Sequence, residues 1–313
     1  MSWPMQHRVR NRALAAAAAL LLLAARSEAA LQVVILEGLP GEPAYAEQFA
    51  AETAALHRAA AMLTDPARIH ELATAQCTRA AVQALFAALA RSSTAEDRLA
   101  LYLVGHGSYD GTEYKFNLSG PDLTGQDLLR LLASLPMRDQ LIVATGSSSG
   151  ALQELLKSPA RVVITGTRGG SERNATRFGT DFAAALTDAG ADTDKNDVIS
   201  AQEAFDFAQR RVKDYYEREV RIASEHAVIA GERASRFTVA RLGAAGAGAA
   251  AASEAAVAAA DPARQKINDA IEALRLRKSE LAEAEYNAQL ETLLLQLATL
   301  DAASSPSASG AAP

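Results

Sequence analysis

Short apolar runs alternate along residues 30–241 with longer segments whose apolar positions recur at helical spacing. Strands separated by helices are typical of a mostly parallel sheet that is covered on both faces. The pattern therefore predicts an α/β fold for this part of the chain. The apolar runs predict buried strands at 31–36, 99–104, 140–145 and 161–165. The longer segments predict helices at 43–63, 77–91, 123–135, 152–156, 174–188 and 201–228.

The pattern changes after residue 241. Residues 242–261 are almost entirely Ala and Gly, which predicts a linker. Residues 262–301 are charged and helical in pattern, which predicts a helical hairpin, with a single long helix or coiled coil as the alternative. The apolar stripes of this helical segment need a partner surface. We therefore expect the segment to dock on the main domain or to self-associate. Residues 302–313, rich in Ser, Ala and Pro, predict a disordered tail. The stripes are Ile267, Ile271 and Leu274, and Tyr286, Leu290, Leu293, Leu294, Leu297 and Leu300.

Residues 1–29 have the form of a secretory signal peptide. A basic stretch precedes an apolar core, and small residues follow at the spacing of a cleavage site. The core is shorter than the roughly 20 residues that span a bilayer. We expect export to a periplasm with no membrane contact after cleavage; an uncleaved anchor is the alternative. The basic stretch contains Arg8, Arg10 and Arg12, the apolar core is Ala13–Ala25, and the small residues are Ser27 and Ala29.

The charge of the chain limits the classes of partner, and its cysteine content limits the disulfides it can form. The formal net charge is −6, and the segment 1–29 contains four of the 31 basic but only one of the 37 acidic residues. A chain that is acidic in this way is unsuited to nucleic acid or an anionic membrane. Cys77 is the single cysteine, so no intramolecular disulfide can form. We expect Cys77 to be a small residue on a half-buried helix.

Two predicted strands end in glycine-rich segments that carry candidate chemistry. Strand 99–104 leads into Gly105-His106-Gly107, and strand 140–145 leads into Gly146-Ser147-Ser148-Ser149-Gly150. Ligands of open α/β sheets bind outside the carboxyl ends of the strands. If the two strands are neighbours, we expect His106 and Ser147 to face one cleft.

These strand ends resemble the caspase/legumain (hemoglobinase) group of cysteine peptidases. There, one strand ends in His-Gly and the next delivers the nucleophile as Ala-Cys, often followed by x-Ser-Gly. The resemblance implies a three-layer α/β sandwich of the caspase-hemoglobinase type. It also implies that His106 is the general base or acid and that the backbone N–H of Gly107 faces the oxyanion. Ser147 stands where the family has cysteine, and Gly146 where it has alanine.

The serine changes the expected chemistry. A thiol loses its proton far more readily than a hydroxyl, so a His–Cys pair works without a third residue. A serine needs a base that is oriented by a carboxylate, and only Asp110 and Glu113 follow His106 closely. We therefore expect a pseudoenzyme that binds a peptide or protein. The alternative is an endopeptidase with His106 as base and Ser147 as nucleophile; Ser148 or Ser149 in the pivotal position is also open.

An acidic loop at 192–203 matches the EF-hand-like calcium pattern D-x-[DN]-x-[DN]-G-x5-E at all but one position. The exception is Asp197, where glycine makes the sharp turn. We expect calcium there, with Ile199 packed inward. The alternative is a helix start at which Ser200 and Glu203 form a capping box. The candidate ligands are Asp192, Asp194, Asn196, the Val198 carbonyl, Ser200 and Glu203.

The position of this loop adds to the resemblance. Bacterial caspase-like domains often carry such a loop after the last core strand, following a helix like the one that begins near Phe178. The resemblance then covers roughly residues 30–235 and is greatest to bacterial legumain-like proteins. His57, His70 and His226 lack metal-ligand spacing, and we expect Glu225-His226 to lie on a solvated face.

Overall fold

The computed structural model describes residues 29–242 and isolated helical positions between 270 and 296. The chain divides into two units, with the boundary between Leu242 and Gly243. The predicted signal peptide, linker and tail lie outside the described residues, and so does most of the predicted hairpin at 262–301. None of the described helices is both long and apolar enough to cross a bilayer.

A six-stranded sheet with strand order β10-β8-β7-β3-β1-β2 forms the centre of the first unit. All neighbours run parallel except β10, which is antiparallel to β8 at one edge. The four predicted buried strands are the four inner strands. The sheet consists of β1 (Leu31–Glu37), β2 (Ile69–Leu72), β3 (Arg98–Val104), β7 (Asp139–Ala144), β8 (Arg161–Thr165) and β10 (Val228–Ala230).

Helices cover both faces of this sheet, as the pattern predicts. Several begin at sequence signals: Pro43 at a first helical position, the Thr78 side chain as an N-cap, and a capping box between Thr124 and Asp127. The helices are α2 (Pro43–Ala61), α3 (Arg79–Ser92), α4 (Gly125–Ala133), α5 (Leu152–Leu156), α6 (Phe178–Ala185) and α7 (Ala201–Arg218).

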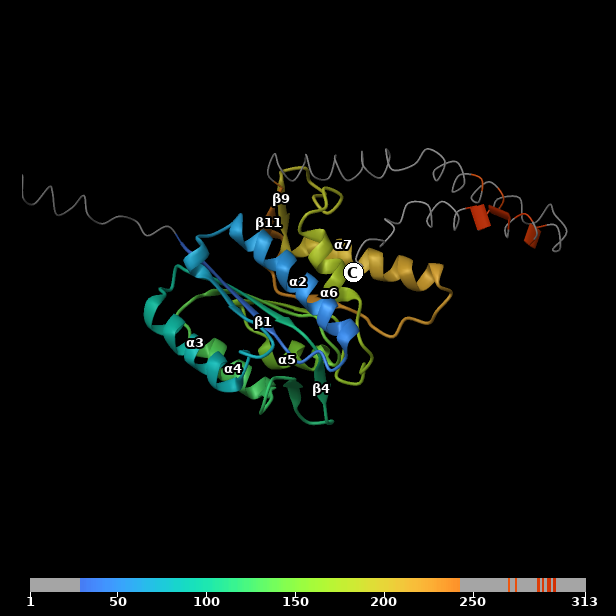
Figure 1. Cartoon of the computed structure of the whole chain (residues 1–313). Coiled ribbons are helices and arrows are strands. Elements are labelled where there is room, and N and C mark those ends of the chain that lie inside the picture. Colours follow the sequence, from blue (N-terminus) through green and yellow to red (C-terminus); the bar gives the residue numbers. More distant parts are fainter. Residues whose placement is uncertain are drawn as a thin grey trace, which may run out of the picture. The chain divides into compact units, whose positions relative to one another are not determined.

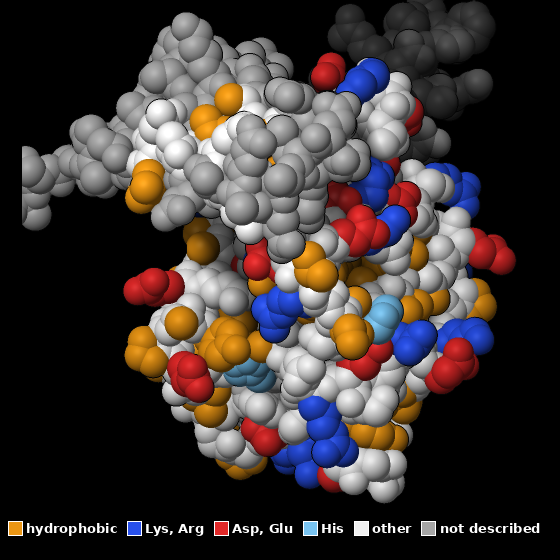
Figure 2. Space-filling model, turned by 90° about the vertical axis from the view of Figure 1, so that its right-hand side faces the viewer, with side chains coloured by type: hydrophobic (Ala, Val, Ile, Leu, Met, Phe, Trp, Pro, Cys, Tyr) orange, Lys and Arg blue, Asp and Glu red, His pale blue; other side chains and the backbone are white. Residues whose placement is uncertain are grey.

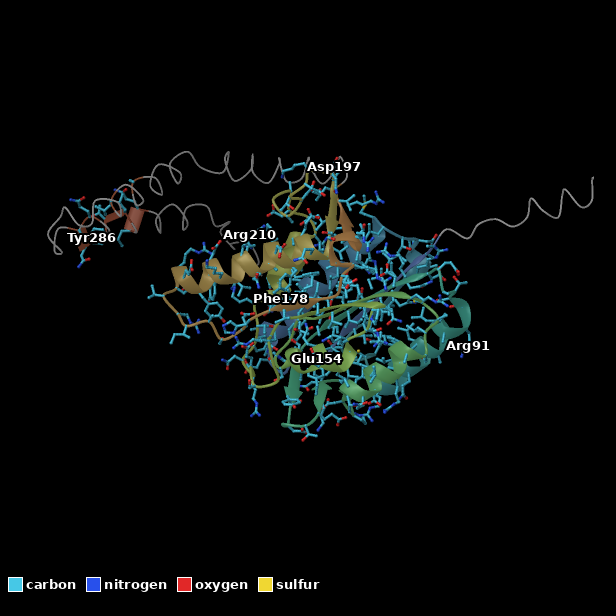
Figure 3. All side chains as sticks on the ribbon, turned by 180° about the vertical axis from the view of Figure 1, so that it is seen from behind. Arg91, Glu154, Phe178, Asp197, Arg210 and Tyr286 are labelled. Atoms are coloured by element: carbon cyan, nitrogen blue, oxygen red, sulfur yellow. The ribbon has the colours of Figure 1, made fainter. Side chains whose placement is uncertain are left out.

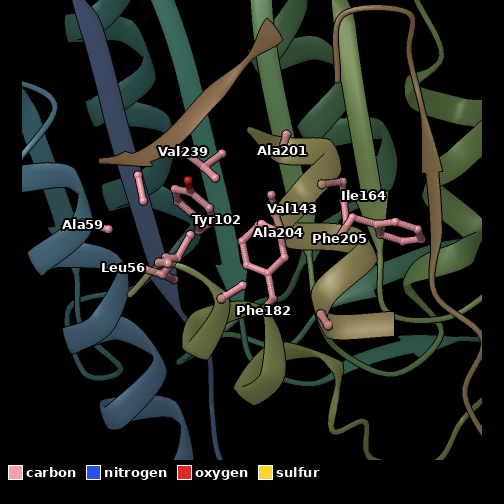
Figure 4. Packing of buried hydrophobic residues seen from close by; sticks show 14 of the residues in the cluster. Leu56, Ala59, Tyr102, Val143, Ile164, Phe182, Ala201, Ala204, Phe205 and Val239 are labelled. Atoms are coloured by element: carbon pink, nitrogen blue, oxygen red, sulfur yellow. The ribbon is translucent and has the colours of Figure 1, made fainter. Parts of the chain in front are cut away.

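Successive residues of a strand point to opposite faces and so build two cores. Val33 and Ile35 of β1 pack with α2, α6 and α7, whereas Val34 and Leu36 pack with α3, α4 and α5. Figure 1 shows these two helix layers on either side of the strands. In the first core, Tyr102 of β3 lies near Phe182 of α6, with ring centroids 6.5 Å apart (Figure 4). The protein is therefore a three-layer α/β sandwich with a mostly parallel sheet.

Shorter elements complete the unit. A three-stranded antiparallel sheet follows β3 directly, so that Gly107 is the first residue of its first strand. A two-stranded pair joins the acidic loop to the end of the unit. The strands are β4 (Gly107–Tyr109), β5 (Tyr114–Phe116), β6 (Leu123–Thr124), β9 (Val198–Ser200) and β11 (Thr238–Arg241); single 3-10 turns are η1 (Pro66–Arg68), η2 (Ser149–Ala151) and η3 (Ala234–Arg236).

The predicted helix at 201–228 is wrong in its second part, because α7 ends at Arg218. Val220 takes a left-handed conformation with φ 50°, and the Arg221 N–H bonds back to the carbonyl of Tyr216. This geometry closes a helix and is usual for glycine rather than for a β-branched residue. Residues 221–227 then lead to β10 without regular secondary structure.

Candidate functional site

His106 and Ser147 lie at equivalent positions beyond two neighbouring strands. β3 and β7 pair in parallel with Leu103 opposite Ala144, and each candidate residue stands three positions further along. The Thr145 N–H donates to the Leu103 carbonyl at 3.3 Å, which keeps the strands paired to their ends. The prediction that the two residues follow adjacent strands is confirmed.

Glycine holds the two strand ends against each other. A Cβ on Gly146 would collide with the carbonyl oxygen of Gly105 and would stand 3.3 Å from the Gly107 nitrogen. A Cβ on Gly107 would stand 2.5 Å from the Ser147 carbonyl oxygen. The Gly107 amide predicted to face an oxyanion therefore lies against the main chain of Gly146.

The imidazole of His106 packs against helix α2. Its ring lies edge-on to Tyr45, with centroids 4.6 Å apart, and to Phe49, with centroids 5.1 Å apart. Burial lowers the pKa of His106, although the Pro40 carbonyl and the charge of Glu42 oppose this shift. His106 is therefore mainly neutral near pH 7, and no hydrogen bond joins it to Ser147 among the described residues.

The three serines after β7 form a buried turn. Ser147 is 5% exposed, and Ser148 and Ser149 are fully buried. Ser148 takes a left-handed conformation with φ 57°, its N–H donates to the Glu172 carbonyl at 2.8 Å, and its hydroxyl has no partner in the described part of the chain. The Ser149 hydroxyl lies 3.3 Å from that of Thr167. The turn is thus fixed by the loop after β8 and offers little hydroxyl surface.

A narrow cleft opens beside these strand ends and has room for about one water molecule. His106 lines it and Ser147 does not, so the expectation of one shared cleft holds only for His106. Its walls come from α2, the ends of β3 and β7, and the segment that leads into the first turn of α6. The lining residues are Tyr45, Gln48, Phe49, Glu52, Gly105, His106, Thr145, Gly146, Ala175, Thr176 and Gly179.

Glu52 brings a buried carboxyl group into this cleft, and the sequence analysis missed it. The side chain is 4% exposed, and burial raises its pKa to about 7 against hydrogen bonds from Gln48 and Thr180, both at 2.8 Å. In sequence it is one acidic residue in an Ala-rich amphipathic helix. Its place three residues after Phe49, on the apolar face, is the signal that points inward.

Glu225-His226 was expected on a solvated face, which is wrong for Glu225, whereas His226 is exposed. Glu225 is 3% exposed and accepts hydrogen bonds at 3.0 Å from the backbone N–H groups of Arg177 and Phe178. His226 Nδ1 lies 2.7 Å from the Glu172 carboxylate. The two residues therefore fasten the loop after β8 and the start of α6.

Asp110 and Cys77 do not contribute to this site. Asp110 accepts hydrogen bonds from Thr112, Glu113 and Lys115 within its own hairpin turn, so it does not orient His106. Cys77 is fully buried just before α3, and burial raises the pKa of its thiol to about 12. Neither residue supplies the missing catalytic group.

The acidic loop has the geometry of a calcium loop in several respects. Asp197 takes the left-handed conformation, with φ 60°, that glycine usually provides at this position. Its N–H and that of Asn196 donate to the Asp192 carboxylate. Ile199 is fully buried, as expected, and Figure 3 shows Asp197 at the outer tip of the loop.

The carboxylates fit a hard cation. One oxygen each of Asp192, Asp194 and Glu203 lie within 4.8 Å of one another, which matches ligands placed about 2.4 Å from a common ion. The capping box is present too, with Ser200 and Glu203 hydrogen-bonded in both directions. Burial would raise the pKa of Glu203, but bonds from Ser200 and Thr193 outweigh it and lower the pKa to about 2. An ionised Glu203 suits either role.

Comparisons with known proteins add little to this geometry. No family model and no curated protein matches the chain. Among solved structures, it is similar to protein GSU0716 from Geobacter sulfurreducens, with 13% sequence identity and a TM-score of 0.44. The match covers 64% of this chain and 94% of that chain. A similarity of this size identifies neither a family nor an activity.

Proposed function

We propose that the chain is an exported protein with a caspase/legumain-like fold that has no peptidase activity and binds a peptide or protein ligand. The position of His106 and Ser147 carries the proposal. They occupy equivalent places after neighbouring strands, yet the imidazole packs on Tyr45 and Phe49 while Ser147 is 5% exposed. The two residues stand where a catalytic pair would stand, but their side chains do not contact each other.

The physical chemistry of serine strengthens the first half of this proposal. A hydroxyl attacks only when a base removes its proton, and that base must be held in place by a third group. His106 is hydrogen-bonded to no carboxylate among the described residues. His106 lines the narrow cleft and Ser147 does not, so a peptide bond placed in this cleft would not meet both side chains.

The surface around the strand ends supports a binding role. The loop after α7 exposes Val220 and Ile222 at 91% and 95%, which is unusual for large aliphatic side chains. On the face shown in Figure 2, the described acidic and basic side chains are interspersed, with hydrophobic ones among them. A mixed surface of this kind suits a protein or peptide better than a polyanion.

We further propose that Ca2+ binds at 192–203 as a structural ion. When bound there it would link the loop to the start of α7, with Asp192, Asp194 and Glu203 as carboxylate ligands. Export, a periplasmic location and self-association through residues 262–301 complete the proposal; they are inferred from the sequence pattern.

Incubation of the purified protein with a diverse peptide library tests the main proposal. We expect no cleavage by the parent, by Ser147→Ala or by Ser147→Cys, with or without calcium, and retention of a subset of peptides. Mass spectrometry of the free and retained fractions measures both. Cleavage that disappears in Ser147→Ala would refute the loss of activity, and failure to retain any peptide would refute the binding role.

One observation favours a second candidate, a serine-type hydrolase. The Glu172 carboxylate lies 2.7 Å from His226 Nδ1, and the Glu172 carbonyl accepts the Ser148 N–H. Glu172, on the loop that touches the serine turn, thus orients an imidazole from the segment between α7 and β10. If the library is cleaved, activity lost in His226→Ala but kept in His106→Ala would assign it to this pair.

A further inference from the structure

Only one of the two oxygens of the Glu52 carboxyl group accepts hydrogen bonds from the described residues. Its Oε1 accepts hydrogen bonds from Gln48 Nε2 and Thr180 Oγ1, both at 2.8 Å. Its Oε2 accepts none among the described residues and lies 2.5 Å from where a Cβ on Gly179 would stand. The free oxygen thus has only the cleft in which to find a partner.

The described residues that line the cleft offer no positively charged side chain to the free oxygen of Glu52. Among the described residues that line the cleft there is no lysine or arginine, and Tyr45, Glu52 and His106 are the ionisable ones. His106 is mainly neutral near pH 7, since burial lowers its pKa. Asp181 on α6 adds a negative charge nearby, and its own partners are Arg211 of α7 at 2.9 Å and Arg177, just before α6, at 3.8 Å. In the described part of the chain, Glu52 is thus a buried acid that forms no ion pair.

The shape of the cleft selects what could supply that charge. Room for about one water molecule suits an ammonium group, which is of similar size, better than the larger, planar guanidinium. The aromatic rings of Tyr45 and Phe49 form part of the wall and would contact an alkyl chain that leads to the ammonium.

We infer that this cleft is a subsite for a primary ammonium group, supplied by a lysine side chain of a bound peptide, with Glu52 as its counter-ion. The inference rests on the proposed peptide-binding function for the source of the lysine, and it names the ligand chemistry that the fold selects. Glu52 is here a binding residue and takes part in no bond-breaking step.

Binding of this kind depends on pH with a defined sign. Only the ionised carboxylate attracts an ammonium, and with a pKa of about 7 its ionised fraction rises about tenfold between pH 6 and pH 8. The other charged groups near the cleft are Glu42 before α2 and Asp181 on α6, which is paired with Arg177 and Arg211. Burial lowers the pKa of His106, so any positive charge on it is lost as the pH rises, which acts in the same direction. Affinity therefore increases with pH.

The test uses small probes on the full protein, so that it does not depend on peptide binding. Nα-acetyl-lysine N-methylamide is titrated at pH 8 and pH 6 and followed by NMR of 13C-labelled glutamate carboxyls. The comparison probes are the norleucine, arginine and glycine N-methylamides; norleucine and arginine are acetylated, and glycine carries a free α-ammonium. We expect the lysine probe to bind about tenfold more tightly at pH 8 and to shift one carboxyl resonance that is missing in Glu52→Gln.

Two variants make the result specific. Glu52→Gln keeps the size of the side chain and an oxygen for Thr180, and we expect it to lose lysine binding. Glu47→Gln removes the same charge from an exposed position of α2 and should bind like the parent. Equal binding of norleucine, arginine or the glycine α-ammonium, or binding retained in Glu52→Gln, would overturn the inference. Peptide retention without lysine preference would overturn it while leaving the proposed function intact.

Discussion

The main chains of Gly105 and Gly146 lie in direct contact where β3 and β7 leave the sheet, so that a Cβ on Gly146 would collide with the Gly105 carbonyl oxygen. Even the methyl group of an alanine at position 146 does not fit this backbone. The two strand ends therefore lie against each other directly before Ser147.

Gly146→Ala should destabilise the protein by about 3 kcal/mol or more, because backbone rather than a flexible side chain must move to admit the methyl group. Denaturant unfolding followed by circular dichroism measures the loss. Gly169→Ala is the matched control: a Cβ there would have one neighbour at 4.0 Å, and the change should stay within about 1 kcal/mol. Equal effects of the two substitutions would show that the contact is not tight.

Cys77 should be inert to thiol reagents in the folded protein. Burial raises the pKa of its thiol to about 12, so the reactive thiolate is nearly absent at pH 8, and the side chain is fully buried. We expect no reaction with Ellman's reagent before unfolding and one thiol per chain in guanidinium chloride. Rapid modification under native conditions would show that the thiol is accessible and its pKa is not raised.

The sheet and the placement of His106 and Ser147 could be predicted because they depend on local patterns. Apolar runs such as 99–104 and 140–145 mark buried parallel strands, and glycines mark where each run ends. Local patterns do not say which strands are neighbours, and that expectation came only from the resemblance. The end of α7 could not be found in this way, because Val220 takes a conformation for which glycine is the usual signal.

The burial of Glu52 and Glu225 was beyond a sequence argument for a different reason. Both carboxyls are buried by elements distant in sequence: Glu52 contacts Thr180, and Glu225 contacts the backbone of Arg177 and Phe178. Local patterns describe the residue's own element, and charged residues are usually exposed. Only the tertiary structure shows which acidic groups the fold encloses.

Glu52 should make the protein less stable as the pH rises from about 4.5 to about 7. In this window Glu52 is ionised in the unfolded chain but stays protonated in the folded protein. Ionisation therefore stabilises the unfolded state and lowers the free energy of unfolding. Above about pH 7 the loss is complete and constant. We expect Glu52→Gln to match the parent near pH 4 and to exceed it at pH 8, by at most about 3 kcal/mol.

Thermal or urea unfolding across this pH range measures the effect, with Glu47→Gln as the exposed control. A Glu52→Gln curve that runs parallel to that of the parent at all pH values would mean that the carboxyl is ionised at its ordinary pKa, and hence that it is solvated.

Calcium should raise the unfolding temperature of the protein at millimolar concentration, since an ion bound only by the folded state stabilises it by mass action. Glu203→Gln removes a carboxylate of the acidic cluster and should abolish the gain. Asp188→Asn is the control, because Asp188 lies outside the loop and bonds the N–H of Gly190, which an Asn oxygen can also accept. No shift in the parent would leave the loop as a capping box alone.

Replacement of Glu225 by Ala should be among the most damaging changes at an acidic residue of this chain. Its carboxylate accepts the backbone N–H groups of Arg177 and Phe178 and the hydroxyl of Tyr216, and it is 3% exposed. Alanine would leave these donors buried without an acceptor, which costs about 1–3 kcal/mol for each unsatisfied group. Urea unfolding should show a loss of about 3 kcal/mol, and Glu225→Gln, which keeps one acceptor oxygen, should lose less. Glu219→Ala, at an exposed position, should lie within about 0.5 kcal/mol of the parent. If Glu225→Ala behaved like Glu219→Ala, Glu225 would be solvated as its sequence context suggests, and the start of α6 would be fastened by other contacts.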